Sequence, residues 1–170
     1  MSTTAISREG TNASVVLRLV PGLAAGMAFA MWAMIVGIFA SRLWAPPQGI
    51  AQSVGIGSQG WDFQLVPFIL GLMGHMMNSI IIGLIFLAIV AALKLRGAAL
   101  VLAGMMYGIA VYLVMYYPIL RGLLASNSGS FLSSNPEWSW VLAHIMYGTI
   151  LGLLLAFGPF RAPWTQRGSR

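Results

Sequence analysis

The stretch Gly71-Leu-Met-Gly-His75-Met-Met-Asn-Ser79-Ile-Ile-Ile-Gly83 sets the architecture expected of this chain. It is apolar enough to lie in lipid, yet it contains a histidine. Steps of four residues place Gly71, His75, Ser79 and Gly83 on one face of an α-helix. Small residues on one face let two helix backbones approach closely in a membrane. The stretch therefore predicts a membrane-spanning helix whose packing face includes an ionisable group.

The composition of the whole chain is typical of a membrane protein. Of its 170 residues, 59% are hydrophobic and 7% are charged, whereas a soluble domain carries about 25% charged residues. A helical span needs ~20 apolar residues, and four stretches meet this requirement: 21–40, 68–93, 98–120 and 138–158. We expect an all-α membrane protein, a four-transmembrane-helix bundle over residues 18–160. Residues 1–17 are expected to be a disordered N-terminus, and residues 161–170 a basic tail.

The basic residues are sorted between the two sides of the membrane. Seven lie in the terminal segments or in the turn after the second span, and two lie in the other loops. This asymmetry predicts that both termini and the turn are cytoplasmic, in an inner or plasma membrane. The net charge of +6 forms no patch, so nucleic-acid binding is not expected. The seven are Arg8, Arg18, Lys94, Arg96, Arg161, Arg167 and Arg170; the two are Arg42 and Arg121.

The residue types needed for catalysis are missing from the spans. There is no cysteine in the chain, which excludes thiol chemistry, and no predicted span contains a carboxylate. Ser79 follows His75 by one helical turn, but no acid is placed to orient the histidine as a hydrolase requires. A proton-coupled carrier would also lack its usual buried acid. We therefore expect a protein that is not an enzyme.

A second stretch repeats the first after 69 residues, with His144, Gly148 and Gly152 at the positions of His75, Ser79 and Gly83. The first and third spans share less, a Gly-Met pair. We interpret this as two tandem helical hairpins, an internal repeat about an axis along the membrane normal. The predicted helix-packing residues are Gly22, Gly26, Ser79, Gly83, Gly104, Gly108, Gly148 and Gly152.

The polar residues of the spans fall in the half away from the cytoplasm, whereas most packing glycines fall in the cytoplasmic half. This distribution predicts a cup that opens outward and narrows inward. It would hold a small apolar ligand or dock another membrane subunit or a second copy. The candidate ligand-binding residues are His75, His144, Asn78, Tyr112, Tyr116 and Tyr147.

Two histidines on facing helices have several interpretations. They can be neutral groups that hydrogen-bond neighbouring helices. They can also hold a haem between them, as bis-histidine ligands in a bundle do; a pigment on one histidine is a weaker variant. Copper is disfavoured because the methionines near His75 and His144 lie at +1 and +2, off the histidine face. No cofactor or metal is therefore predicted, and haem is kept as the alternative.

The loop between the first two spans carries Pro46-Pro47 and predicts a short interfacial helix at Gln48–Gly55. Together with Gly74-His75 and the His144–Gly152 stretch, the motif Pro46-Pro47-Gln-Gly-Ile50-Ala51-Gln-Ser-Val54-Gly55 resembles small bacterial four-span inner-membrane proteins of unknown function. The resemblance covers most of residues 20–158, and Ser79 departs from it where the fourth span has Gly148. It implies the same architecture and brings no activity. We expect an accessory or structural membrane subunit, or a binder of a small apolar ligand; the alternative is a haem-binding electron-transfer subunit.

Overall fold

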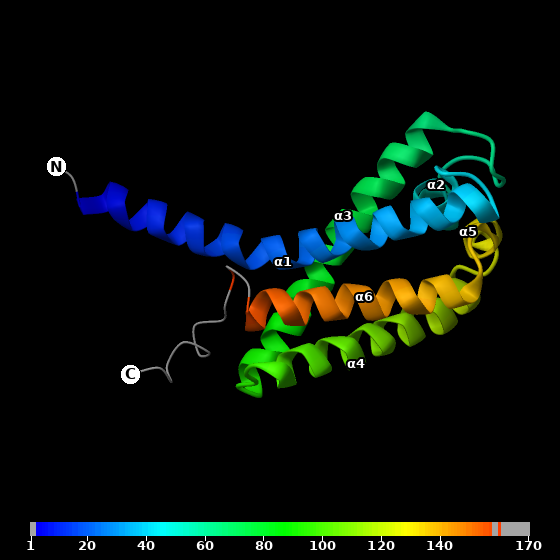
Figure 1. The fold of residues 1–170 in the computed structure, drawn as a ribbon. Coiled ribbons are helices and arrows are strands. Elements are labelled where there is room, and N and C mark those ends of the chain that lie inside the picture. Colours follow the sequence, from blue (N-terminus) through cyan, green and yellow to red (C-terminus); the bar gives the residue numbers. More distant parts are fainter. Residues whose placement is uncertain (1–2, 158–159, 161–170) are drawn as a thin grey trace.

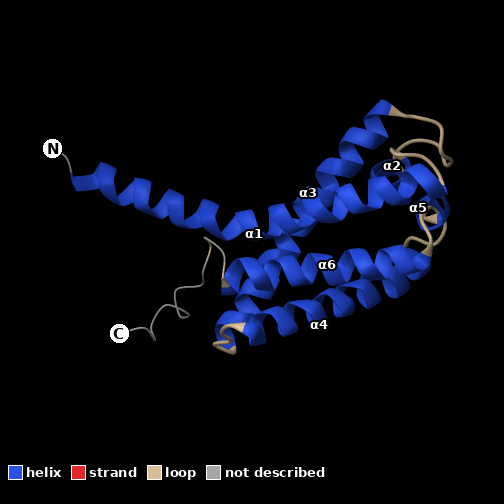
Figure 2. Cartoon of the chain, viewed as in Figure 1, coloured by secondary structure: helices blue, strands red, loops and turns tan. Residues whose placement is uncertain are grey.

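The computed structural model describes residues 3–157 and 160, with side chains from residue 18 onward. Its regular elements are helices joined by loops (Figure 2). In chain order they are α1 (Thr3–Ala40), α2 (Ala45–Ser53), α3 (Leu65–Ala92), α4 (Ala98–Val114), the π-helix η1 (Met115–Leu123), α5 (Gly129–Ser134) and α6 (Glu137–Ala156).

Within these residues, four helices are long and apolar enough to cross a membrane: Arg18–Ala40, Leu65–Ala92, Ala98–Leu123 and Glu137–Ala156. The predicted all-α fold with four membrane-spanning helices is thereby confirmed. Two boundaries differ from the prediction. Disorder was expected over residues 1–17, but the backbone is helical from Thr3 onward. Helix α1 runs through this segment and continues past Pro21. The fourth helix ends at Ala156, and the predicted basic tail, 161–170, lies outside the described residues.

The four long helices are arranged in a row, α3–α1–α6–α4. Helix α1 packs against α3 and α6, and α4 packs against α6, whereas α3 and α4 make few direct contacts. Figure 1 shows α1, α6 and α4 one below another, with α3 running obliquely across them. We call the end with α2, α5 and the loop of residues 54–64 the loop end, and the end with the turn of residues 93–97 the turn end. The bundle is therefore two hairpins, α1 with α3 and α4 with α6, that are open between α3 and α4.

Small residues bring the backbones together within each hairpin. A Cβ added to Gly148 would collide with the carbonyl oxygen of Gly104, and one on Gly108 with the carbonyl oxygen of His144. In the other hairpin, a Cβ on Gly83 would lie 2.7 Å from the Cα of Gly22. The paired helix backbones approach each other this closely because no side chain lies between them at these glycines. The other predicted packing residues lie at the same two crossings: Gly26, Ser79, Gly104 and Gly152.

Helix α2 differs from the interfacial helix expected at Gln48–Gly55. It begins earlier, with Pro46 and Pro47 in its first turn, where a missing N–H costs nothing. It is buried along its length instead of lying on lipid. A Cβ on Gly71 of α3 would collide with the carbonyl oxygen of Pro47, so α2 packs directly on α3. This places α2 across the loop end of the bundle.

The third span was predicted to end at residue 120, but α4 is followed directly by the π-helix η1, which contains Pro118 and runs through Leu123. Proline cannot donate to the preceding turn, and a π-helical segment accommodates that loss by widening the helix. Tyr112, Tyr116, Tyr117 and Arg121 come to lie around one point, the carboxylate of Glu137. The irregular helix therefore fixes the position of α4 relative to the start of α6.

Candidate ligand-binding cavity

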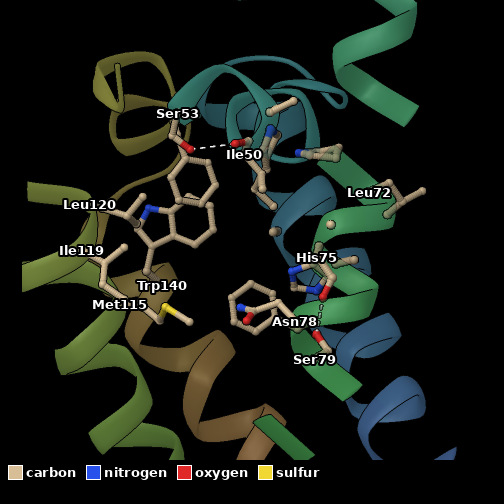
Figure 3. Close-up of a pocket in the computed structure, with 18 of the residues that line it drawn as sticks. Ile50, Ser53, Leu72, His75, Asn78, Ser79, Met115, Ile119, Leu120 and Trp140 are labelled. Carbon is tan, nitrogen blue, oxygen red and sulfur yellow. Dashed lines mark hydrogen bonds between the residues drawn. The ribbon is translucent and has the colours of Figure 1, made fainter. Parts of the chain in front are cut away.

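A cavity of about 420 Å³ lies between α3 and η1, on the open side of the row of helices. Its floor comes from α1 and α6, and α2 lines its loop end (Figure 3). Ile82 is part of the lining, and its carbonyl oxygen accepts from the hydroxyl of Tyr107 at 2.8 Å; the ring of Tyr107 lies 5.1 Å from that of Phe86. The sequence predicted a cup that opens at one end of the bundle. In the structure α2 covers the loop end of the cavity, and the open side of the cavity lies between α3 and η1. The lining is mainly apolar: Phe29, Ala30, Ala33, Ile50, Ala51, Leu70, Leu72, Ile82, Val111, Met115, Ile119, Leu120 and Phe131 are among its residues.

His75 and His144 line this cavity from facing helices, with the ring of Phe29 beside both. The centroid of Phe29 is 5.0 Å from that of His75 and 4.8 Å from that of His144. His75 Nε2 is 3.0 Å from the carbonyl oxygen of Gly26, and His144 Nδ1 is 2.7 Å from that of Trp140. Each contact makes the ring nitrogen a donor to a backbone carbonyl. The pair therefore acts as polar bridges, His75 between α3 and α1 and His144 along α6.

The arrangement does not suit a haem between the two histidines. Iron needs a free lone pair on a nitrogen of each ring and an open space between the rings. Here Phe29 packs against both rings, and His75 Nε2 is bonded to the carbonyl oxygen of Gly26, which leaves Nδ1 as the free nitrogen of that ring. A haem between the two rings would require Phe29 to leave its position beside them. Among the described residues, no group of three or more His, Cys, Asp or Glu side chains is placed to hold a metal ion.

Three other predicted site residues surround His75. The hydroxyl of Ser79 donates to the carbonyl oxygen of His75 at 2.8 Å, and that of Tyr147 donates to the carbonyl oxygen of Ser79. The Ser79 hydroxyl is therefore bonded within its own helix and is not aimed at the His75 ring. Asn78 also lines the cavity but is exposed, and its amide has no hydrogen-bond partner in the described part of the chain.

Tyr112 and Tyr116 belong to a polar cluster that the sequence did not reveal. The hydroxyls of Tyr112 and Tyr117 donate to Glu137 Oε1 at 2.9 and 3.1 Å, and that of Tyr116 donates to Oε2 at 3.2 Å. Arg121 Nη2 lies 3.6 Å from Oε2 and donates to the Tyr116 hydroxyl at 2.9 Å. We call these five residues the Glu137 cluster. The sequence placed Glu137 in a loop, so its role as the first residue of α6, facing η1, could not be read from spacing alone.

Phe29 and Trp140 are cavity residues that the sequence analysis did not single out. Trp140 is 3% exposed, and its indole Nε1 is buried without a hydrogen-bond partner. Its ring packs against Phe131 at 4.8 Å between centroids. Both aromatic residues lie on the helix faces predicted to pack, but only the pairing of α1 with α6 shows that they share one space.

Comparisons with protein-family models, curated proteins and solved structures found no match for this chain.

Proposed function

We propose that this protein is a non-enzymatic integral membrane protein that takes up a small apolar ligand from the bilayer into the cavity. In this role it would serve as an accessory subunit of a membrane assembly or as a homo-oligomer. It would lie in the inner or plasma membrane with both termini in the cytoplasm. One observation carries the proposal: an apolar cavity of about 420 Å³ lies within the membrane spans, on the side where α3 and η1 stand apart.

The dimensions of the cavity support this function. Ligand sites in proteins have volumes of ~300–1,000 Å³ and are mostly apolar with a few polar groups. Along α3 the lining runs from Leu70 to Ile82, a length of about 18 Å at ~1.5 Å per residue. That is about three fifths of the thickness of a bilayer core of ~30 Å. A ligand dissolved in one leaflet would therefore lie at the same depth in the bilayer as the cavity.

The two hairpins give further support to an internal repeat, which we also propose. In the first, Gly83 meets Gly22 and Ser79 meets Gly26; in the second, Gly152 meets Leu100 and Gly148 meets Gly104. When His75 is aligned with His144 and Gly26 with Gly104, the contacts in the two hairpins join equivalent positions. A ligand site between two such halves matches the arrangement of repeat-built membrane carriers.

Quenching of Trp140 fluorescence by brominated lipid tests the function. The protein would be placed in lipid nanodiscs whose phospholipids carry brominated acyl chains, and the Trp140 signal taken as the difference from Trp140→Phe. Trp140 is buried from lipid by the fold, so it will be quenched only if an acyl chain enters the cavity. Gly74 lines the cavity, and a Cβ there would meet nothing within 4 Å. Gly74→Leu should therefore fill the opening and protect Trp140.

Met77→Leu is the matched control, because Met77 is 63% exposed on the same helix and lies outside the lining. It should leave the quenching unchanged. Absence of Trp140 quenching in the wild-type protein would refute entry from lipid. A visible absorption spectrum of the protein purified in mild detergent tests the haem alternative, which a Soret band would support over our proposal.

A further inference from the structure

Each of the two imidazole rings in the cavity has one nitrogen without a hydrogen-bond partner. His75 Nε2 contacts the carbonyl oxygen of Gly26, and His144 Nδ1 contacts that of Trp140. A carbonyl oxygen can only accept, so the nitrogen that faces it carries the proton, and the other nitrogen of the neutral ring has a free lone pair. The free nitrogens are therefore His75 Nδ1 and His144 Nε2, and both are acceptors.

Both free nitrogens are accessible within the cavity. In the described part of the chain, the side-chain nitrogen and oxygen atoms that are buried without a partner are Gln52 Oε1, Asn135 Oδ1 and Trp140 Nε1. The two histidine nitrogens also lack a partner but do not belong to this set, so each has exposed surface. Both histidines line the cavity, and Figure 3 shows the His75 ring on the side of α3 that faces it. A molecule in the cavity can therefore donate to them.

The depth of these acceptors restricts the ligand to neutral molecules. His75 is the eleventh of the 28 residues of α3, which places it about 5 Å from the middle of the helix at ~1.5 Å per residue. An ionised group at this depth needs an opposite charge beside it. Among the described residues, no Asp, Glu, Lys or Arg belongs to the lining. A phospholipid headgroup therefore has no charged partner there, whereas a hydroxyl group needs only an acceptor.

Two acceptors call for two donors on one ligand. The ring centroid of Phe29 lies 5.0 Å from that of His75 and 4.8 Å from that of His144, so the two imidazoles are no further apart than these distances together. Two hydroxyl groups on adjacent carbons, each with a hydrogen bond of ~2.8 Å, span a gap of this order. Esters, ethers and ketones cannot donate and would leave both nitrogens unpaired.

We propose that the cavity binds a neutral lipid with two hydroxyl groups, the chemistry of a monoacylglycerol, and that its hydroxyls donate to His75 Nδ1 and His144 Nε2. The acyl chain leaves between α3 and η1 into lipid. This inference rests on the proposed function, because it names the ligand class for the same cavity. It concerns binding alone, and no covalent bond is formed or broken.

Nitrogen-15 NMR of the imidazoles tests the two contacts directly, because the chain has two histidines and His144→Phe assigns their signals. The protein, labelled in its histidines, would be placed in phospholipid nanodiscs. Without ligand the rings should be opposite tautomers, protonated at Nε2 in His75 and at Nδ1 in His144. Monoolein should move both unprotonated nitrogens to lower frequency, as accepting a hydrogen bond does. Methyl oleate, which has the same acyl chain and no hydroxyl, should leave both frequencies unchanged.

The mole fraction of ligand at half-saturation measures the contribution of each hydroxyl. A neutral hydrogen bond corresponds to about a five-fold change in affinity. Oleyl alcohol, with one hydroxyl, should therefore bind about five-fold more weakly than monoolein, and methyl oleate should compete only at about twenty-five-fold higher mole fraction. His144→Phe should weaken monoolein about five-fold. Met77→Leu, outside the lining, should not change its binding.

The ligand comparisons in the wild-type protein can overturn the proposal without any variant. Monoolein that moves neither nitrogen, or only one, would exclude a ligand with two hydroxyls in contact with both histidines. Half-saturation by methyl oleate at the mole fraction of monoolein would do the same. Oleic acid that binds more tightly than monoolein and protonates an imidazole would identify the ligand as an acid. If brominated lipid still quenches Trp140 in these cases, only the ligand class is wrong; if it does not, the proposed function fails as well.

Discussion

Glycine has two different roles on these helices. Substitution by alanine, which adds a Cβ, distinguishes the two roles. At Gly148 a Cβ would meet the backbone of Gly104, which cannot move without separating α4 from α6. At Gly74 a Cβ would enter open space. The four-residue spacing in the sequence predicted the first role for Gly148, but it gave no sign that Gly74 faces a cavity.

We expect Gly148→Ala to lower the free energy of unfolding by about 1–3 kcal/mol, the usual cost of overpacking. Gly74→Ala should raise it by up to ~1 kcal/mol, because alanine favours the helix over glycine. Denaturant-induced unfolding in mild detergent measures both. Equal effects of the two variants would mean that α4 and α6 do not meet at Gly148.

The polar residues were harder to predict than the glycines. The sequence identified His75, His144 and Asn78 as candidates, and all three line one cavity. It could not foresee that Phe29 would pack against both imidazole rings, since that depends on how α1 is rotated between α3 and α6. Nor could it foresee that the tyrosines of η1 would turn towards Glu137. That contact depends on a π-helical turn, for which Pro118 is only a weak signal.

At the level of elements, α2 is held in place by two glutamines on one of its faces. Gln48 is fully buried, donates from Nε2 to the carbonyl oxygen of Asp62 at 2.9 Å and accepts from the backbone N–H of Gln64 at 2.8 Å. Gln52 donates from Nε2 to the carbonyl oxygen of Ser58 at 2.6 Å. The loop of residues 54–64 is therefore tied to α2 through side-chain amides, in place of the lipid contact that the sequence predicted for this helix.

Gln48→Leu should speed amide hydrogen exchange in residues 58–64, because the loop loses its three hydrogen bonds to the Gln48 side chain while the buried volume is nearly kept. Exchange followed by mass spectrometry gives the comparison. Ser133→Ala is the control, since the Ser133 hydroxyl is exposed and bonds within α5. Unchanged exchange in the Gln48 variant would show that the loop is held by other contacts.

At the scale of the whole molecule, length and hydropathy were enough to predict four membrane-spanning helices, and the repeated histidine stretch led to the prediction of two hairpins. They were not enough to predict the order of the helices in space. Although the turn of residues 93–97 is short, the two helices that it joins, α3 and α4, make few contacts. Their small residues are used at the crossings with α1 and α6, so little remains to join them to each other.

The orientation in the membrane is a prediction of the charge distribution, and the cysteine-free sequence allows it to be tested. Leu93 and Ser133 are exposed at the turn end and the loop end, respectively. In intact cells, a membrane-impermeant maleimide should label Ser133→Cys and leave Leu93→Cys unlabelled until the membrane is permeabilised. The reverse pattern would invert the topology and place the termini outside.

The order α3–α1–α6–α4 has a consequence for how the chain is assembled. Helices α1 and α3 are made first and can pair at once, but α4 follows with no extensive partner among the helices already present. Its glycine face is matched only by α6, the last long helix of the described chain to be synthesised. Helix α6 then enters between α1 and α4 and joins the two halves. A nascent chain that ends after η1 would therefore contain one paired hairpin, α1 with α3, and one helix, α4, whose packing partner α6 has not yet been synthesised.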